Sequence, residues 1–378
     1  MFGRDGIVYN RLWNFKHGSE GERSWSRAKC PLPETNQDEE RHAMKLALIV
    51  AVLLCVFLSR VAFSQPVPTF KDVQYGPDPV YQSLDAYLAQ TDQPSLVLVE
   101  IHGGGWNAGA KSSRGMEASS GRVKNYLAAG ISVISINYRL TTHAPWPAQL
   151  DDAARAVQFV RSKANEWNVD SDKVALIGGS AGAHIAMMLA FSPERAKPDS
   201  EDPIERQSTK VRCVIQKAGP ADLSVMIREL AKDYLPRDTD RETQGAPLGK
   251  VLDLVGMEAE DFGSEEFYRR LSEISPINHV TKDSPPVFIQ YKVPEGVTSG
   301  DDPRLKWGIH SPLSGYMLEK ELKAKGVPYE MLMTPDLKDE NNILTIENQM
   351  KTIAFIRKHG GVEPPVPAKR AIRSPSND

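Results

Sequence analysis

Cysteine is scarce in this chain, and neither sign of charge is in excess. The 378 residues contain three Cys, which cannot form a disulfide framework and disfavour a structural zinc site. The 46 Lys and Arg stand against 49 Asp and Glu, a formal net charge of −3. This balance gives no electrostatic reason to expect nucleic acid or an anionic membrane surface as a partner. The composition is that of a soluble globular protein.

A long hydrophobic run is also lacking. The apolar run 46–58 has 13 residues, short of the roughly 20 that cross a bilayer as a helix. Basic Arg41 and Lys45 precede it, and small Ala62 and Ser64 follow it. This order of basic, apolar and small residues is typical of a signal peptide and predicts export to the periplasm or the extracellular space.

These features predict how the chain is divided. We expect a signal peptide over 44–64 and one domain over 65–360. Residues 1–43 are either a mis-called start or a short cytoplasmic tail. In the tail alternative, the run 46–58 is an uncleaved membrane anchor. Residues 361–378 have too little apolar surface to repay ordering and are predicted to be a disordered tail.

Short apolar runs alternate with amphipathic segments along the domain. Most of the runs are continuous, as in buried parallel strands: 96–101, 131–136, 174–177, 214–215, 287–289 and 329–333. Helical spacing of apolar residues marks 122–129, 148–167, 181–190, 264–271, 313–325 and 343–359. The alternation predicts an α/β fold with a mostly parallel sheet of about eight strands and helices on both faces.

A glycine-rich turn joins the predicted strand 174–177 to the helix that follows. It reads Gly178-Gly179-Ser180-Ala181-Gly182, a G-x-S-x-G pattern between a strand and a helix. Small neighbours allow the tight turn that exposes a serine Oγ at a helix N-terminus. Ser180 is therefore a candidate nucleophile, the alternative being a structural Gly-Ser turn.

A second glycine-rich turn, His102-Gly103-Gly104-Gly105-Trp106, follows the predicted strand 96–101. Glycines let backbone N–H groups approach a developing oxyanion, so Gly103, Gly104 and Gly105 are candidate donors, with the N–H of Ala181 as a further one. His102 is expected to orient this loop rather than act as a base. Trp106 is a candidate wall of the substrate pocket, or simple packing.

The two turns, with further motifs, carry a family resemblance. The further motifs are 136–140 (INYRL), 145–147 (PWP), Asp151-Asp152, 219–223 (GPADL) and 275–277 (SPI). Over about residues 69–359 the chain resembles α/β-hydrolase esterases of the hormone-sensitive-lipase and feruloyl- and acetyl-esterase-like type. The resemblance implies a carboxyl-ester hydrolase with a Ser/His/acid triad, no cofactor and no metal. Its substrates would be small acyl esters or acylated carbohydrates, selected by a cap drawn from 65–90, 194–210 and 227–267.

The second half of the triad departs from this pattern. The resemblance places the acid just after strand 287–289, where Glu295 stands, with Asp301 and Asp302 as rivals. All three could equally be solvated loop carboxylates. It places the catalytic His after the last strand, where 334–341 contain none.

The eight His of the chain can be sorted by position. His310, in a loop after the seventh strand, is predicted to emerge at the same sheet edge as Ser180 and is the candidate relocated base. The alternative is a His satisfied by local backbone near a helix N-terminus. The other seven are set aside. His17 and His42 precede the domain, His143 lies in a turn and His102 in the oxyanion loop. His184 is expected to pack within its helix, His279 to lie at the surface or in packing, and His359 to end the last helix.

Two functions follow from these residues. The first is a secreted serine carboxylesterase acting through an acyl-enzyme on a small-molecule or carbohydrate-linked ester, with no nucleic-acid partner and no stable membrane partner if the leader is cleaved. The second is a catalytically impaired homologue that binds a ligand in the old active-site pocket.

Overall fold

The computed structural model describes residues 42, 44–49, 66–113, 116–118, 121–234, 246–337 and 344–361. The chain forms two compact units, residues 1–64 and 65–378. In the first unit, residues 44–49 are helical with exposed side chains. The rest of the predicted signal peptide, most of residues 1–43 and the predicted tail from 362 lie outside the described residues. No helix within the described ranges is long and apolar enough to cross a membrane.

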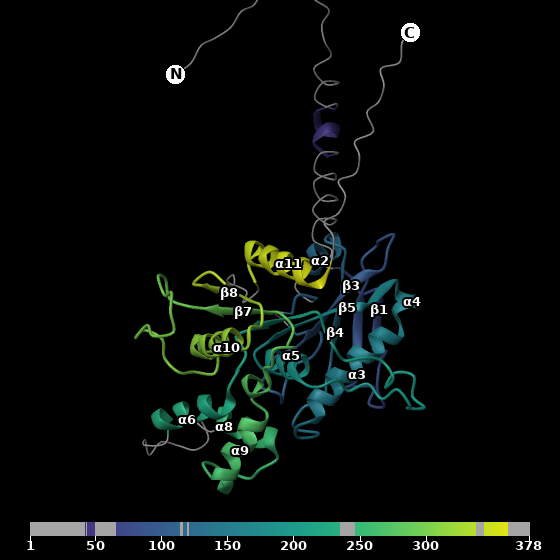
Figure 1. Ribbon diagram of the computed structural model, residues 1–378. Coiled ribbons are helices and arrows are strands. Elements are labelled where there is room, and N and C mark those ends of the chain that lie inside the picture. Colours follow the sequence, from purple (N-terminus) through teal and green to yellow (C-terminus); the bar gives the residue numbers. More distant parts are fainter. Residues whose placement is uncertain are drawn as a thin grey trace, which may run out of the picture. The chain divides into compact units, whose positions relative to one another are not determined.

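An eight-stranded sheet forms the centre of the second unit (Figure 1). Its spatial order is β1-β2-β4-β3-β5-β6-β7-β8. The strands are β1 (Phe70–Gln74), β2 (Ser83–Tyr87), β3 (Ser95–Ile101), β4 (Ile131–Ile136), β5 (Val169–Gly179), β6 (Cys213–Lys217), β7 (Val287–Lys292) and β8 (Tyr329–Thr334). β1 pairs with β2, and β2 with β4, antiparallel, whereas the other neighbours are parallel. The predicted mostly parallel sheet is therefore confirmed.

β1 and β2 were not among the predicted strands. β1 has mostly exposed side chains, so its sequence carries no apolar run, and β2 has only five residues. The prediction that 65–90 belong to a cap is wrong, because these residues supply two strands of the main sheet instead. Sheet pairing stabilises them through backbone hydrogen bonds that side-chain pattern does not reveal.

Helices cover both faces of the sheet. The described helices are α2 (Val123–Ala128), α3 (Ala148–Ser162), α4 (Ala164–Trp167), α5 (Ala181–Phe191), α6 (Leu223–Tyr234), α8 (Ala246–Val255), α9 (Glu265–Glu273), α10 (Pro312–Lys325) and α11 (Ile346–Gly360), with short 3-10 turns at Ala259–Asp261 and Pro276–His279. In Figure 1, α2 and α11 lie on one face, and α3, α5 and α10 lie on the other. Alternate side chains of β3 divide between these layers: Val97 and Val99 pack in one core cluster, Leu96 and Leu98 in the other.

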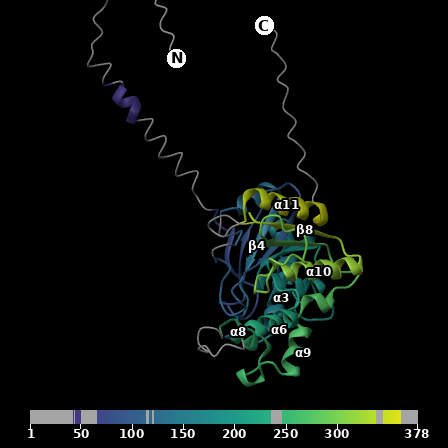
Figure 2. The same cartoon turned by 90° about the vertical axis from the view of Figure 1, so that its left-hand side faces the viewer.

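α6, α8 and α9 gather beside one another beyond α5 (Figures 1 and 2). The Trp146 N–H donates to the Leu254 carbonyl at 2.9 Å, and Arg270 Nη1 donates to the Val255 carbonyl at 3.0 Å. These bonds attach α8 to the sheet domain on one side and to α9 on the other. α6 and α8 thus form much of the cap that the sequence placed within 227–267.

The charged segment 194–210, also predicted to belong to the cap, packs against α3 instead. Arg155 Nη1 lies 2.8 Å from Asp202 Oδ2, and Gln158 Nε2 donates to the Glu205 carbonyl at 3.1 Å. The cap prediction is wrong for this segment, because its ion pairs and backbone acceptors match polar groups on α3.

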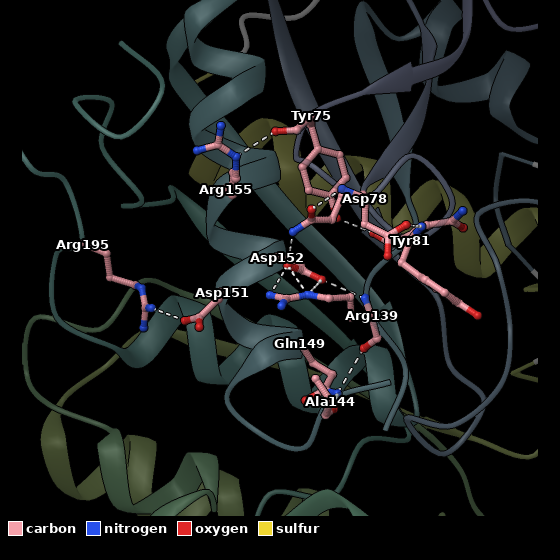
Figure 3. A network of polar contacts seen from close by, with 12 residues as sticks. Tyr75, Asp78, Tyr81, Arg139, Ala144, Gln149, Asp151, Asp152, Arg155 and Arg195 are labelled. Carbon is pink, nitrogen blue, oxygen red and sulfur yellow. Dashed lines mark hydrogen bonds and ion pairs between the residues drawn. The ribbon is translucent and has the colours of Figure 1, made fainter. Parts of the chain in front are cut away.

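A partly buried ion pair fixes the segment after β4 to α3 (Figure 3). Arg139 Nη2 lies 2.7 Å from Asp152 Oδ1, and the Arg139 N–H donates to Asp152 Oδ2 at 2.8 Å. Gln82 Nε2 donates to the same carboxylate at 2.6 Å, and Asp152 is almost fully buried. The neighbouring Asp151 binds Arg195. Both carboxylates of this acidic pair from the sequence resemblance are therefore held by structural ion pairs.

Candidate active site

Ser180 occupies a strained turn between β5 and α5. Its φ of 54° and ψ of −120° lie in a region that non-glycine residues rarely adopt, and such conformations cost about 1–3 kcal/mol. A Cβ on Gly178 would lie 2.3 Å from the Gly182 carbonyl carbon, and a Cβ on Gly182 would lie 2.1 Å from the Ile101 oxygen. The Ser180 N–H donates to the Lys217 carbonyl at 2.9 Å. The glycines of the pattern are therefore required by backbone approach, and the turn is held to β6.

His310 meets Ser180 across the sheet edge. Its Nε2 lies 2.8 Å from Ser180 Oγ. The imidazole stands in the loop between β7 and α10, directly before Ser311, which caps α10 by accepting from the Leu313 N–H. The Ser311 hydroxyl also donates to the Lys306 carbonyl at 2.8 Å. These two bonds anchor the loop next to His310, which is itself exposed to solvent.

The glycine-rich loop after β3 lies against the Ser180 turn. A Cβ on Gly103 would lie 2.7 Å from the Gly179 oxygen and 3.4 Å from Ser180 Cβ. Gly104 has a φ of 117° and Gly105 a φ of 62°, values that favour glycine. Within the described part of the chain, no hydrogen bond uses the N–H groups of Gly103, Gly104, Gly105 and Ala181. These donors are available to a ligand oxygen beside Ser180.

Two buried imidazoles support the loop. His102 Nδ1 lies 2.7 Å from the Gly103 carbonyl, and its ring stacks on Tyr138 at 4.2 Å between centroids. His184 Nε2 lies 2.7 Å from the Ile274 carbonyl, and its Nδ1 accepts from Trp106 Nε1 at 3.3 Å. Burial lowers the pKa of both His102 and His184 to about 4, so both are neutral at pH 7. Their contacts orient and pack, as expected from the sequence.

Trp106 combines the two roles that the sequence left open. It is buried, packs edge-on against His184 at 5.3 Å, and also lines the cavity. The remaining imidazoles lie elsewhere. His279 Nε2 contacts the Glu273 carbonyl at 2.7 Å, His143 contacts the Thr142 hydroxyl, and His359 packs on Phe355.

The three candidate acids lie in the loop that precedes His310, but the structure does not bring them to it. Asp302 is held by Arg304, whose Nη2 lies 2.7 Å from Oδ2 and whose Nε lies 3.0 Å from Oδ1. This partner lowers the pKa of Asp302 to about 2. Glu295 and Asp301 are exposed, and Arg304 Nη1 donates to the Glu295 backbone carbonyl at 2.9 Å. Among the described residues, no hydrogen bond or ion pair joins Glu295, Asp301 or Asp302 to His310.

A cavity of about 770 Å³ opens onto Ser180 and His310. Apolar side chains from α6 and α8 form one wall: Met226, Ile227, Leu230 and Val251. Three lysines also line the cavity: Lys217, Lys250 and Lys292. Sequence reasoning did not single out these residues, although apolar residues recur at helical spacing through 223–231. No group of three or more potential metal ligands occurs within the described ranges.

The arrangement defines an α/β-hydrolase fold with a serine–histidine pair at the carboxyl ends of its parallel strands. The BD-FAE family model matches residues 84–292, more than half of the chain. The chain therefore belongs to the BD-FAE family. Its active-site candidates Ser180 and Gly103–Gly105 lie inside the matched range, whereas His310 lies outside it.

The chain is also similar in sequence to curated esterases and in fold to solved structures. Esterase LipQ of Mycobacterium tuberculosis is 26% identical over 58% of this chain and 47% of LipQ, and esterase LipC of the same organism is 27% identical over 57% of this chain and 49% of LipC. The chain thus spans about half the length of these relatives. A truncated carbohydrate esterase from gut microbiota has a TM-score of 0.59 at 22% identity, covering 79% of this chain and 99% of that one. Esterase B from Lactobacillus rhamnosis has a TM-score of 0.55 at 18% identity, covering 86% and 96%.

Proposed function

We propose that this protein is an exported serine carboxylesterase that cleaves small acyl esters or acyl groups on carbohydrates through an acyl-enzyme. The observation that carries the proposal is the 2.8 Å approach of His310 Nε2 to Ser180 Oγ beside a cavity. The esterase names of LipQ and LipC and the carbohydrate-esterase neighbour support the class of substrate. The predicted leader 44–64 supports export.

The mechanism needs His310 neutral, with the proton on Nδ1, so that Nε2 accepts the Ser180 hydroxyl proton. As the proton moves to Nε2, Ser180 Oγ attacks the carbonyl carbon of the ester. The carbonyl oxygen then becomes an oxyanion. The N–H groups of Ala181 and of the Gly103–Gly105 loop stabilise that charge. His310 then donates its proton to the departing alcohol oxygen, which leaves the acyl group on Ser180.

Hydrolysis of the acyl-enzyme repeats these steps with water. His310 accepts a proton from the water as its oxygen attacks the acyl carbonyl, and returns that proton to Ser180 Oγ as the carboxylic acid departs. Each proton that His310 takes is given back, so the protein ends in its starting state. The strained Ser180 turn presents Oγ for both attacks.

Covalent trapping tests the proposal directly. The 65–378 protein, incubated with a p-nitrophenyl alkylphosphonate, should release one equivalent of p-nitrophenol and gain the mass of the phosphonyl group on Ser180. Ser180→Ala should neither react nor hydrolyse p-nitrophenyl butyrate. A wild-type protein that binds esters without Ser180-dependent turnover would instead be the ligand-binding homologue.

A further inference from the structure

The cavity beside Ser180 is lined by more cationic than anionic side chains. Its described lining holds three lysines, Lys217 on β6, Lys250 on α8 and Lys292 at the end of β7, against one carboxylate, Glu100 on β3. An ester pocket for neutral acyl groups needs no cations. The fold itself neutralises some of these charges and not others.

Lys217 and Glu100 have partners within the fold. Lys217 Nζ lies 3.2 Å from Glu117 Oε1, and both side chains are buried. The Glu100 carboxylate accepts the N–H groups of Glu117 at 2.6 Å and Ala118 at 3.0 Å. Burial raises the pKa of Glu100 to about 7, so it carries only part of a negative charge at neutral pH. This side of the cavity is a balanced structural network.

Lys250 and Lys292 differ from Lys217. Neither has an ion pair with any residue that the structure describes. Lys250 is half-buried on the cap helix α8, and its Nζ lies 3.4 Å from the point where a Cβ on Gly105 would stand. Its ammonium therefore borders the loop that carries the candidate oxyanion donors. Lys292 is exposed at the end of β7.

A half-buried ammonium loses part of its hydration, and a bound anion can supply the favourable interaction that the lost water provided. The effective interaction between two charges also strengthens as water is displaced from a cavity. The apolar side chains of Met226, Ile227 and Leu230, which line the same cavity as Lys250, would reduce the water around a bound ligand. These features favour a ligand that is mainly apolar but carries one negative group.

We infer that this cavity selects esters that carry a carboxylate a few bonds from the scissile ester group, with Lys250 binding the carboxylate and Lys292 adding positive potential. The inference rests on the proposed serine-esterase function and names its substrate class. The carboxylate can belong to the acid or the alcohol half of the ester, because Lys250 and Ser180 line the same cavity and either half of a bound ester would lie within it. Lys250 is thus a specificity-determining residue.

Two matched substrate pairs test this inference. For the acid half, monoethyl succinate is compared with its neutral isostere ethyl succinamate; for the alcohol half, 3-acetoxypropionate is compared with 3-acetoxypropanamide. Hydrolysis is followed by pH-stat at low ionic strength. In at least one pair, kcat/KM should be about tenfold higher for the anion, the effect of one partly desolvated charge pair. The preference should shrink in 0.5 M NaCl, because salt screens the attraction.

Variants assign the preference to Lys250. Lys250→Met should bring the anion-to-amide ratio of kcat/KM close to one, and Lys250→Arg should keep most of it. Lys320→Met is the matched control, because Lys320 is an exposed helical lysine outside the cavity lining, and its ratio should equal that of wild type. Thermal melts establish that each variant is folded; if Lys250→Met does not fold, the wild-type and Lys250→Arg ratios decide.

The outcomes separate two failures. If hydrolysis depends on Ser180 but kcat/KM for the amide equals or exceeds that for the anion in both pairs, this inference is wrong and the esterase proposal stands. A ratio unchanged in folded Lys250→Met would do the same. Absence of Ser180-dependent hydrolysis of all four compounds and of p-nitrophenyl butyrate would overturn the proposed function, and this inference with it.

Discussion

His310 Nε2 lies 2.8 Å from Ser180 Oγ although 130 positions separate the two residues in the chain. β5 ends directly before Ser180, and the loop that contains His310 leaves the end of β7. Because β5, β6 and β7 are parallel neighbours, both residues emerge at one edge of the sheet. A histidine in this loop can therefore reach Ser180, as one placed after the neighbouring parallel strand β8 could.

Replacing His310 with Ala should lower kcat for p-nitrophenyl butyrate by about 10⁴- to 10⁶-fold, because Ser180 would lose its proton acceptor. His279→Ala is the matched control: its imidazole is partly exposed, contacts the Glu273 carbonyl and does not line the cavity, so wild-type turnover is expected. Steady-state kinetics of the two variants, with melting curves, check this. Comparable activity in the two variants would contradict a base role for His310.

Replacing Asp302 with Asn should cost far less activity. Its carboxylate is bound to Arg304, so the change should loosen the loop before His310 and lower kcat by less than about tenfold. Loss of a triad acid costs about 10⁴-fold. Measuring kcat for Asp302→Asn and for Glu295→Gln distinguishes a carboxylate that only holds the loop from one that acts as the triad acid. A loss of about 10⁴-fold in Asp302→Asn would make Asp302 the acid.

Gly103→Ala should damage catalysis more than folding. The added Cβ would crowd the Gly179 oxygen and move the oxyanion loop away from Ser180, so we expect kcat to fall about 10²- to 10³-fold, the cost of losing one oxyanion donor. Gly249→Ala is the control. A Cβ there meets nothing within 4 Å and lies within α8, so this variant should be more stable by about 0.5–1 kcal/mol. An unchanged kcat in Gly103→Ala would remove this loop from the oxyanion site.

His184 should make the fold sensitive to acid. Its pKa falls from the ordinary 6.5 to about 4 on burial. Between pH 6.5 and pH 4 the unfolded chain therefore binds a proton at this residue that the native state does not bind. Its contribution is complete above pH 6.5 and is lost as pH falls toward 4. His184→Gln should be less stable than wild type at pH 7.5 but lose less of its unfolding free energy on acidification. Urea titrations at pH 7.5, 6 and 5 measure both slopes, and parallel slopes would contradict the assignment.

Glu100 should lower the free energy of unfolding as pH rises, the opposite of the effect of His184. Burial raises its pKa from the ordinary 4.5 to about 7, so the native state holds a proton that the unfolded chain releases. Its contribution is most favourable below pH 4.5 and declines as pH rises through 7. Glu100→Gln keeps an acceptor for one of the two backbone N–H groups and carries no charge. Its stability relative to wild type should therefore increase between pH 5 and 8, and a constant difference over that range would show that Glu100 does not titrate there.

Local pattern was enough to locate half of the candidate site. Continuous apolar runs identified six strands, and glycine spacing located Ser180 and the loop 103–105, because a tight turn and close backbone approach impose residue type directly. His310 followed from topology: a loop leaving a parallel strand emerges at a known edge. These inferences need only the chain order of strands and helices.

The rest depended on contacts between distant segments. β1 and β2 are stabilised by pairing in the sheet, and 194–210 by polar groups on α3, none of which leaves a local pattern. The pairing of Asp302 with Arg304, rather than with His310, was equally invisible, since a carboxylate a few residues from an arginine and from a histidine has no preferred partner in sequence. Sequence alone determined which backbone turns the protein has and which serine is the candidate nucleophile, because steric limits act locally. Tertiary structure decided that Asp302 pairs with Arg304 and placed Lys250 beside Gly105, because those contacts are set by how the loops and cap helices pack.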